Sequence, residues 1–235
     1  NGVVAVLRND VTITIPDNFK LLVNGAEPDV SATAGTIDEY EDIKGYITVP
    51  GSLTYVLPGQ YAPVKAEITD NRGDVSVNYV QKTLSIHEQS GTDEIPASLS
   101  GVIDPIYFGK QWSLFMTNDL EGAQNGYYTL RKYIYNNSYL DTFALSWATG
   151  IDITFLGNHV FDNPPFSKES ATNFVSFSDK FFYCDVYFIK SFTVTSNGVH
   201  RDDVFSKRMY FMYTDDDGDG TASWVIVHMT DVVTE

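Results

Sequence analysis

The segment from residue 104 to residue 150 is the one part of this sequence with a sustained helical pattern, and both flanks have the pattern of strands. Asp104 and Pro105 form a helix start, an N-cap followed by proline at the first helical position. Apolar side chains then recur three or four residues apart, as on one buried helix face. Gly150 stands where a left-handed C-terminal cap belongs. We predict three helices, over 105–118, 123–135 and 141–149.

The first hundred residues predict short strands separated by turn residues, as in an all-β sandwich. Asn24-Gly25 is the strongest hairpin signal, because both central positions of such a turn need positive φ. The stretch 83–100 is polar, contains Gly and Pro, and has no apolar period. We therefore place a boundary there, between a small all-β domain at 1–98 and a second domain at 99–235.

After residue 150 the apolar period changes from 3.6 to 2, which is typical of strands. In 180–195 the even positions are almost wholly apolar, whereas the odd positions mix aromatic with polar side chains. This run is long for one strand, so a bulge or strong curvature is expected near Lys190. Residues 162–165 predict a turn. Strands are expected at 151–155, 172–178, 180–195, 204–213 and 222–233.

The order of these elements predicts an α+β fold class. A sandwich-like all-β domain comes first, and three helices packed on a curved antiparallel sheet follow it. Any pocket is expected between those helices and that sheet.

The charge of the chain excludes two classes of partner. It has 31 acidic and 15 basic residues, a net charge of −16. Such a surface repels phosphate backbones and anionic headgroups, so we expect no nucleic acid as a partner. No apolar run of about 18 residues is present either, so we expect no direct membrane insertion within this segment.

The sequence carries no motif that identifies a reaction or a cofactor. Cys184 is the single cysteine and sits in an aromatic run, where a buried and inert thiol is expected. The four histidines have no ligand-like spacing, and glycine-rich phosphate loops are absent. We therefore expect no cofactor and assign no catalytic residue.

The run from Asp215 to Gly220 fits D-x-D-x-D-G, the first half of a calcium loop. Asp215, Asp217 and Asp219 would be the ligands. The twelfth position, however, holds Ile226 instead of the bidentate glutamate, and the flanks predict strands rather than helices. The other interpretation, a tight acidic hairpin tip in which Asp and Gly supply the turn geometry, is preferred. No metal site is assigned.

Three helices followed by long antiparallel strands, with a final hairpin closing the chain, resemble the nuclear-transport-factor-2-like (NTF2-like) cone fold. The resemblance covers 104–235 and includes the closing run Ala222-Ser-Trp-Val-Ile-Val-His-Met. The whole chain also resembles extracellular segments of membrane-tethered proteins of Gram-positive bacteria, in which a small β domain precedes an NTF2-like one. The run from 11 to 25 carries the β-domain part of this likeness.

The resemblance implies a cavity between the helices and the concave face of the sheet, used in some members for catalysis and in others for binding. An enzyme of the isomerase or dehydratase kind needs a base in an apolar pocket, and Asp185 or His159 would supply it. The side chains expected to line the cavity and bind a ligand are Trp112, Tyr127, Trp147, Asp185, Tyr187 and Tyr210.

The expected function is that of a non-enzymatic extracytoplasmic binding or interaction module. Its partner is an unknown small molecule, peptide or envelope protein. The alternative is an NTF2-like isomerase or dehydratase that acts on a small apolar substrate in the cone cavity. The expected location is extracellular or in the cell envelope, tethered by a segment that precedes Asn1.

Overall fold

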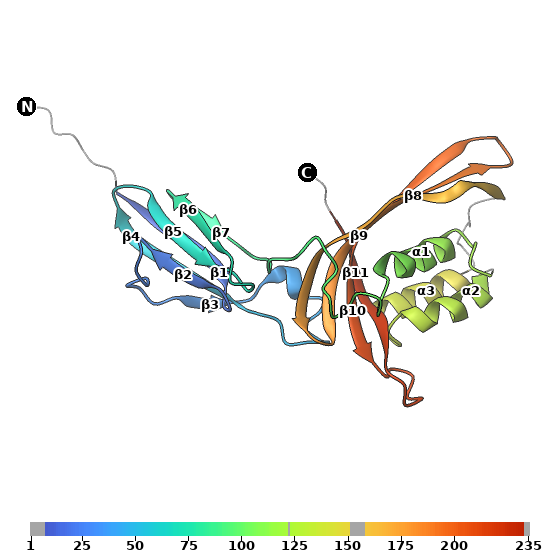
Figure 1. Ribbon diagram of the computed structural model, residues 1–235, viewed down its shortest axis with the longest axis horizontal. Coiled ribbons are helices and arrows are strands. Elements are labelled where there is room, and N and C mark those ends of the chain that lie inside the picture. Colours follow the sequence, from blue (N-terminus) through green and yellow to red (C-terminus); the bar gives the residue numbers. More distant parts are fainter. Residues whose placement is uncertain (1–7, 122, 151–157, 233–235) are drawn as a thin grey trace, which may run out of the picture. The chain divides into compact units, whose positions relative to one another are not determined.

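The computed structural model describes residues 8–121, 123–150 and 158–232. The chain divides into two compact units, Asn1–Ser90 and Gly91–Glu235. β-Sheets make up the first unit, and three helices and a four-stranded antiparallel sheet make up the second (Figure 1). The α+β class expected from the sequence is confirmed. Among the described residues, no helix is long and apolar enough to cross a membrane.

The N-terminal unit contains two sheets, with strand orders β3-β4-β1-β7 and β2-β5-β6. A 3₁₀ turn, Asp38–Tyr40, lies between β3 and β4. The strands are β1 Asn9–Pro16, β2 Lys20–Val23, β3 Thr33–Gly35, β4 Ser52–Gln60, β5 Val64–Thr69, β6 Val75–Val80 and β7 Thr83–Ser85.

Apolar side chains at alternate positions of the strands fill the core of this unit. Val11, Ile13 and Ile15 of β1 are fully buried and pack in one cluster with Ala66 and Ile68 of β5. The predicted Asn24-Gly25 turn is also confirmed, because both residues have positive φ, 53° and 85°.

The helices of the second unit are α1 Pro105–Met116, α2 Ala123–Leu130 and α3 Tyr139–Thr149, with a 3₁₀ turn η2 at Arg131–Tyr133. The Asp104 cap is confirmed, since its carboxylate accepts from the Tyr107 amide at 3.1 Å. Helix α3 starts earlier than predicted because Ser138 caps it. The left-handed cap at Gly150 was wrong: this residue has φ −68° and ψ 135°, an extended conformation.

The sheet of the second unit has the order β11-β10-β9-β8, all antiparallel. The predicted strand 172–178 is the end of β8, which also takes in the predicted turn at 162–165. The predicted strand 151–155 lies outside the described residues. The strands are β8 His159–Ser178, β9 Phe181–Val194, β10 His200–Thr214 and β11 Ser223–Asp231.

The irregularity expected near Lys190 is present, but it belongs to β8. The register against β9 jumps there, since Phe161 pairs with Phe192 and Phe166 pairs with Lys190. The pairing of β9 with β10 runs without a shift from His200↔Thr193 to Met212↔Phe181. Residues 162–165 lie between these two pairings, and the two prolines among them fall in a bulge of a strand at the end of the sheet, where proline is tolerated.

The space between the helices and the sheet is filled by large side chains. Phe188 and Phe205 stack with ring centroids 4.5 Å apart, and Phe115 is 1% exposed. Gly109 of α1 lies directly over that pair, because a Cβ atom there would meet both rings at 3.1 Å. The even positions of β9 face this core, and Cys184 among them is buried as predicted.

Candidate functional site

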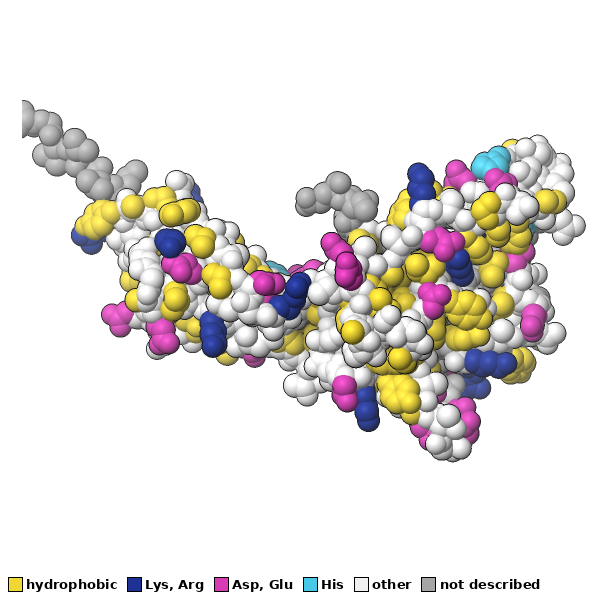
Figure 2. Space-filling view, viewed as in Figure 1, with side chains coloured by type: hydrophobic (Ala, Val, Ile, Leu, Met, Phe, Trp, Pro, Cys, Tyr) yellow, Lys and Arg dark blue, Asp and Glu magenta, His cyan; other side chains and the backbone are white. Residues whose placement is uncertain are grey.

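A groove of about 740 Å³ lies on the surface of the second unit, between the α2–α3 connection and the β10–β11 hairpin. Tyr128, Arg131, Lys132, Asn136 and Asn137 line its helical side. Asp216, Asp217, Asp219, Thr221 and Ser223 line its hairpin side. In the space-filling view acidic side chains lie around the hairpin tip, and basic ones lie on the neighbouring helical side (Figure 2).

Asp141 organises the helical wall of the groove. This carboxylate is nearly buried, and it accepts the Tyr127 hydroxyl at 2.7 Å and the Asn137 amide at 2.9 Å. Arg131 lies 3.7 Å away with its Nε atom. The backbone amide of Asp141 donates to the Ser138 hydroxyl at the N-cap of α3. The short turn between α2 and α3 is therefore held from both sides.

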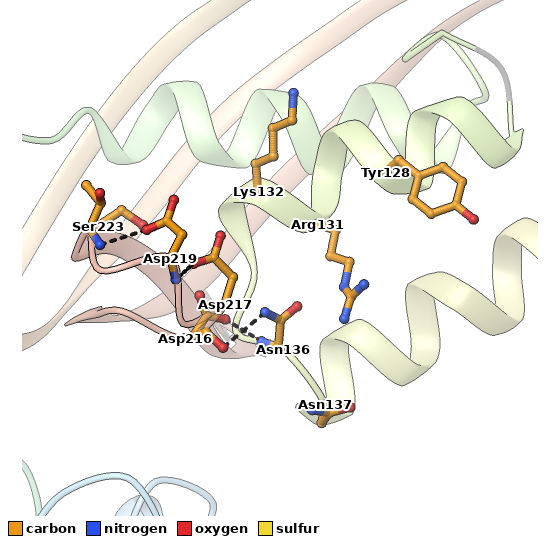
Figure 3. Close-up of a pocket in the computed structure, with 10 residues that line it drawn as sticks. Tyr128, Arg131, Lys132, Asn136, Asn137, Asp216, Asp217, Asp219 and Ser223 are labelled. Carbon is orange, nitrogen blue, oxygen red and sulfur yellow. Dashed lines mark hydrogen bonds between the residues drawn. The ribbon is translucent and has the colours of Figure 1, made fainter.

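The hairpin is fastened to that turn by Asp216. The Asn136 amide donates to the Asp216 carboxylate at 2.7 Å, and the Asn136 side chain donates to the Asp216 carbonyl at 3.3 Å (Figure 3). A backbone bridge between Ile134 and Ile226 continues the contact along the edge of β11. The two walls of the groove are thus parts of one hydrogen-bonded structure.

The basic side chains of the groove differ in direction. The Arg131 guanidinium points into the space between α2 and α3, toward Asn137, whereas the Lys132 ammonium points away from it (Figure 3). Tyr128 is 65% exposed and presents its ring to solvent. The groove consequently offers hydroxyl, amide and charged groups of both signs around an exposed aromatic ring.

The acidic tip brings together the three carboxylates that the sequence indicated. Oxygen atoms of Asp215, Asp217 and Asp219 all lie within 4.8 Å of one another, and all three residues are exposed. Each carboxylate also accepts backbone amides of the tip itself, Asp215 from Gly218 and Gly220 at 3.0 Å. Such bonds are those of a tight turn in which aspartates replace backbone acceptors.

Of the six side chains expected in one cavity, three lie on the helical side of the sheet. Trp112 is buried and stacks on Phe143, whose ring also stacks on Trp147. Tyr127 is 6% exposed and donates to Asp141. Burial, together with this bond, raises the pKa of the Tyr127 hydroxyl to about 12.

The other three lie on the opposite face of the sheet, because odd positions of β9 point away from the helices. The Asp185 carboxylate accepts two hydrogen bonds from the Arg208 guanidinium, from Nε at 2.7 Å and from Nη2 at 3.1 Å. Tyr187 follows on the same face. Tyr210 is buried, with its ring centroid 5.3 Å from that of Tyr183. The six residues therefore do not share a single cavity.

A buried polar chain links α1 to the sheet, and sequence reasoning missed it. Lys190 has a side chain 1% exposed and donates to the Ser113 carbonyl and the Thr117 hydroxyl, both at 2.8 Å. Thr117 donates to Asp119 at 2.5 Å, and the His159 ring lies 3.1 Å from the same carboxylate. The available signal was a lysine at an even, core-facing position of β9.

Burial lowers the pKa of Lys190 to about 8, while the carboxylates of Asp203 and Asp119 act in the opposite direction. Asp203 lies 3.9 Å from the ammonium nitrogen. Ser113 lies in the last turn of α1, where carbonyls lack a backbone partner within the helix, and Thr117 is the residue at its C-cap. Lys190 thus holds the C-terminal end of α1 against β9.

No protein-family model and no curated protein matches this chain. Among solved structures, the chain is similar to one described as "Ntf2 like protein involved in plasmid conjugation". The two are 12% identical, the match covers 93% of this chain and 76% of that chain, and the TM-score is 0.30. This is a distant likeness, and it assigns no activity or partner to the chain.

Proposed function

We propose that the second unit is a non-enzymatic binding module of the NTF2-like kind, which holds a polar segment of a partner protein in its surface groove. The observation that carries the proposal is the groove between the α2–α3 connection and the hairpin. Its hydroxyl, amide and charged groups surround the exposed ring of Tyr128. Aromatic anchors with polar groups around them are typical of protein interfaces.

The packing of the helices on the sheet favours a surface site over an internal one. A ligand between helices and sheet would compete for space with Phe115, Phe188 and Phe205. Gly109 packs so closely against two of these rings that no space for a ligand is left between them. The groove, in contrast, is open to a partner without rearrangement of the core.

The alternative is an isomerase or dehydratase, and the pairing of His159 with Asp119 is the observation that favours it. A histidine oriented by a carboxylate is the usual form of a general base. The other candidate base, Asp185, is held by Arg208 and by Asn173 at 2.9 Å. Both carboxylate oxygens of Asp185 are thus occupied by donors from Arg208 and Asn173, so the binding module remains our proposal.

The extracellular or cell-envelope location belongs to the same proposal. A single buried cysteine forms no disulfide within the chain, so the cysteine content is compatible with a location outside the cytoplasm and equally with one inside it. Fractionation of the native host, with detection by an antibody against the second unit, tests this point. Recovery with the cytoplasmic fraction would contradict it.

A peptide-display selection tests the binding function. Libraries of short random peptides are selected on the full chain and in parallel on Ser223→Trp, which fills the groove from its exposed hairpin side. We expect peptides that bind the unchanged chain and lose at least about tenfold in affinity on the variant. The control is Ser100→Trp, an exposed serine of the same unit outside the groove, which should leave binding unchanged.

Two results would overturn the proposal. One is a selection that enriches no peptide on the unchanged chain. The other is enrichment of peptides whose affinity is the same for all three proteins. Circular dichroism of each variant establishes that the fold is retained before affinities are compared.

A further inference from the structure

Strand β6 of the N-terminal unit is a sheet edge with an apolar outer side. It pairs with β5 on one side, and among the described strands it has no neighbour on the other. Val75, Val77 and Tyr79 point outward and are 62%, 50% and 72% exposed. Alternate residues of such an edge also direct backbone amides and carbonyls outward, where a further strand can pair with them.

Nothing in the sequence of β6 protects this edge. Proteins usually blunt an exposed edge strand with a lysine, a proline or a bulge. The sequence of β6 is VSVNYV, with no charge and no proline, and its pairing with β5 runs without a register shift. A free edge of this kind is a surface for strand addition.

We propose that β6 pairs antiparallel with β6 of a second copy of this chain, around a twofold axis at Val77. In this register Val75 lies opposite Tyr79 of the second copy, and Val77 lies opposite its counterpart. The exposed apolar side chains, Val75, Val77 and Tyr79, then fall on one face of a continuous six-stranded sheet, while Ser76, Asn78 and the buried Val80 fall on the other. The same patch serves both copies, as a twofold contact requires.

The pattern of β6 matches itself, because in this register apolar residues oppose apolar ones and Ser76 opposes Asn78, and its lack of charge lets two like copies approach. Two chains of net charge −16 repel each other over most of their surfaces. The edge of β6 carries no charge, and the nearest charged pair on the outer face, Lys65 with Glu67 at 2.6 Å, is neutral as a whole. Like copies therefore meet here with the least repulsion.

The size of the contact sets its strength. Pairing of one six-residue strand buries much less than the roughly 1,600 Å² of a standard interface. The dimer is therefore expected to be weak and to depend on protein concentration. Because the remaining surfaces repel, added salt should increase the dimer fraction.

Sedimentation velocity of the full chain over a range of concentrations tests the proposal. The unchanged chain should pass from monomer to dimer, and more so at high salt. Val77→Lys places two like charges opposite each other on the axis and should raise the dissociation constant at least about tenfold. Val56→Lys is the matched control: this valine is also 50% exposed, but it lies on β4, in the other sheet of the N-terminal unit, where it pairs with Thr12 of β1.

A cysteine variant gives an independent readout. Opposed residues of an antiparallel pair lie at a distance that a disulfide can bridge. Val77→Cys should therefore form a covalent dimer on mild oxidation, whereas Val56→Cys should not, and the native Cys184 is buried. A chain that is monomeric at all concentrations would overturn the proposal. So would a dimer that Val77→Lys leaves intact, or equal crosslinking through both cysteine variants.

Discussion

Among single residues, Lys190 carries a charge that burial disfavours. Its ammonium group is buried between α1 and the sheet, and its three nearest polar partners are Ser113, Thr117 and Asp203. Its ordinary pKa is 10.5, and burial lowers the pKa to about 8 in the folded chain. The folded protein therefore releases this proton before the unfolded chain does.

The sign of the pH effect follows from that difference. Between the two pKa values the unfolded chain binds more protons, so the free energy of unfolding rises with pH. The contribution of Lys190 is complete above pH 10.5 and is lost as the pH falls through about 8. Its size is at most about 3 kcal/mol.

Lys190→Met should abolish this rise. We expect urea titrations of the unchanged chain to show a free energy of unfolding that increases between pH 8 and pH 10, relative to the variant at each pH. Other groups titrate in both proteins, so the difference between them isolates Lys190. Parallel curves for the two proteins would contradict the placement of this lysine.

Tyr127 is the residue on which the turn between α2 and α3 depends. Tyr127→Phe removes the hydroxyl that donates to Asp141 at 2.7 Å and leaves a nearly buried carboxylate short of one donor. We expect a loss of about 1–3 kcal/mol in the free energy of unfolding, measured with urea at neutral pH. Tyr128→Phe, at the exposed neighbour, should change it by less than about 0.5 kcal/mol.

At the scale of elements, the bond between Asp216 and Asn136 joins the hairpin to the helices. Asp216→Ala should loosen the hairpin from the turn, since it removes the acceptor of the Asn136 amide at 2.7 Å. Hydrogen exchange at that amide should accelerate at least about tenfold, which corresponds to about 1.4 kcal/mol. Asp217→Ala should leave it unchanged, because that carboxylate accepts within the tip.

The acidic tip itself should not bind calcium. Its carboxylates already accept the amides of Gly218, Asp219 and Gly220, and a bidentate glutamate is missing from the pattern. Isothermal titration with calcium should give no saturable heat at millimolar ion. A one-to-one binding curve that disappears in Asp217→Asn would show that the turn interpretation is wrong.

The element order was predictable from the sequence, and the element ends often were not. Asp104-Pro105 marks the start of α1 because the cap and the proline act locally. The start of α3 at Tyr139 depends on Ser138 and on Asp141, whose partners come from α2. A pattern confined to one segment does not contain such tertiary contacts.

The candidate site was less accessible to sequence reasoning than the fold. Two odd positions of β9 were expected to line the cavity under the helices, but the helices cover the even positions, and no local pattern contains that direction. Asp185 and Tyr187 therefore lie on the face away from α1. The groove joins residues about 80 positions apart, such as Asn136 and Asp216, and no local pattern connects them.

At the scale of the whole molecule, the chain combines two kinds of surface. The N-terminal unit presents an uncharged strand edge at β6, and the second unit presents a polar groove beside the acidic hairpin. Each surface lies within one of the two units. We propose that the first pairs with a second copy of the chain and that the second holds a segment of a partner protein.

Binding in the groove can be tested by locating a selected peptide on the second unit. Amide chemical shifts of the full chain are recorded by NMR with and without the peptide. We predict that the largest changes fall on Tyr128, Asn136, Asn137, Thr221 and Ser223. Changes centred instead on Trp112, Phe188 and Phe205, in the space between helices and sheet, would contradict the account.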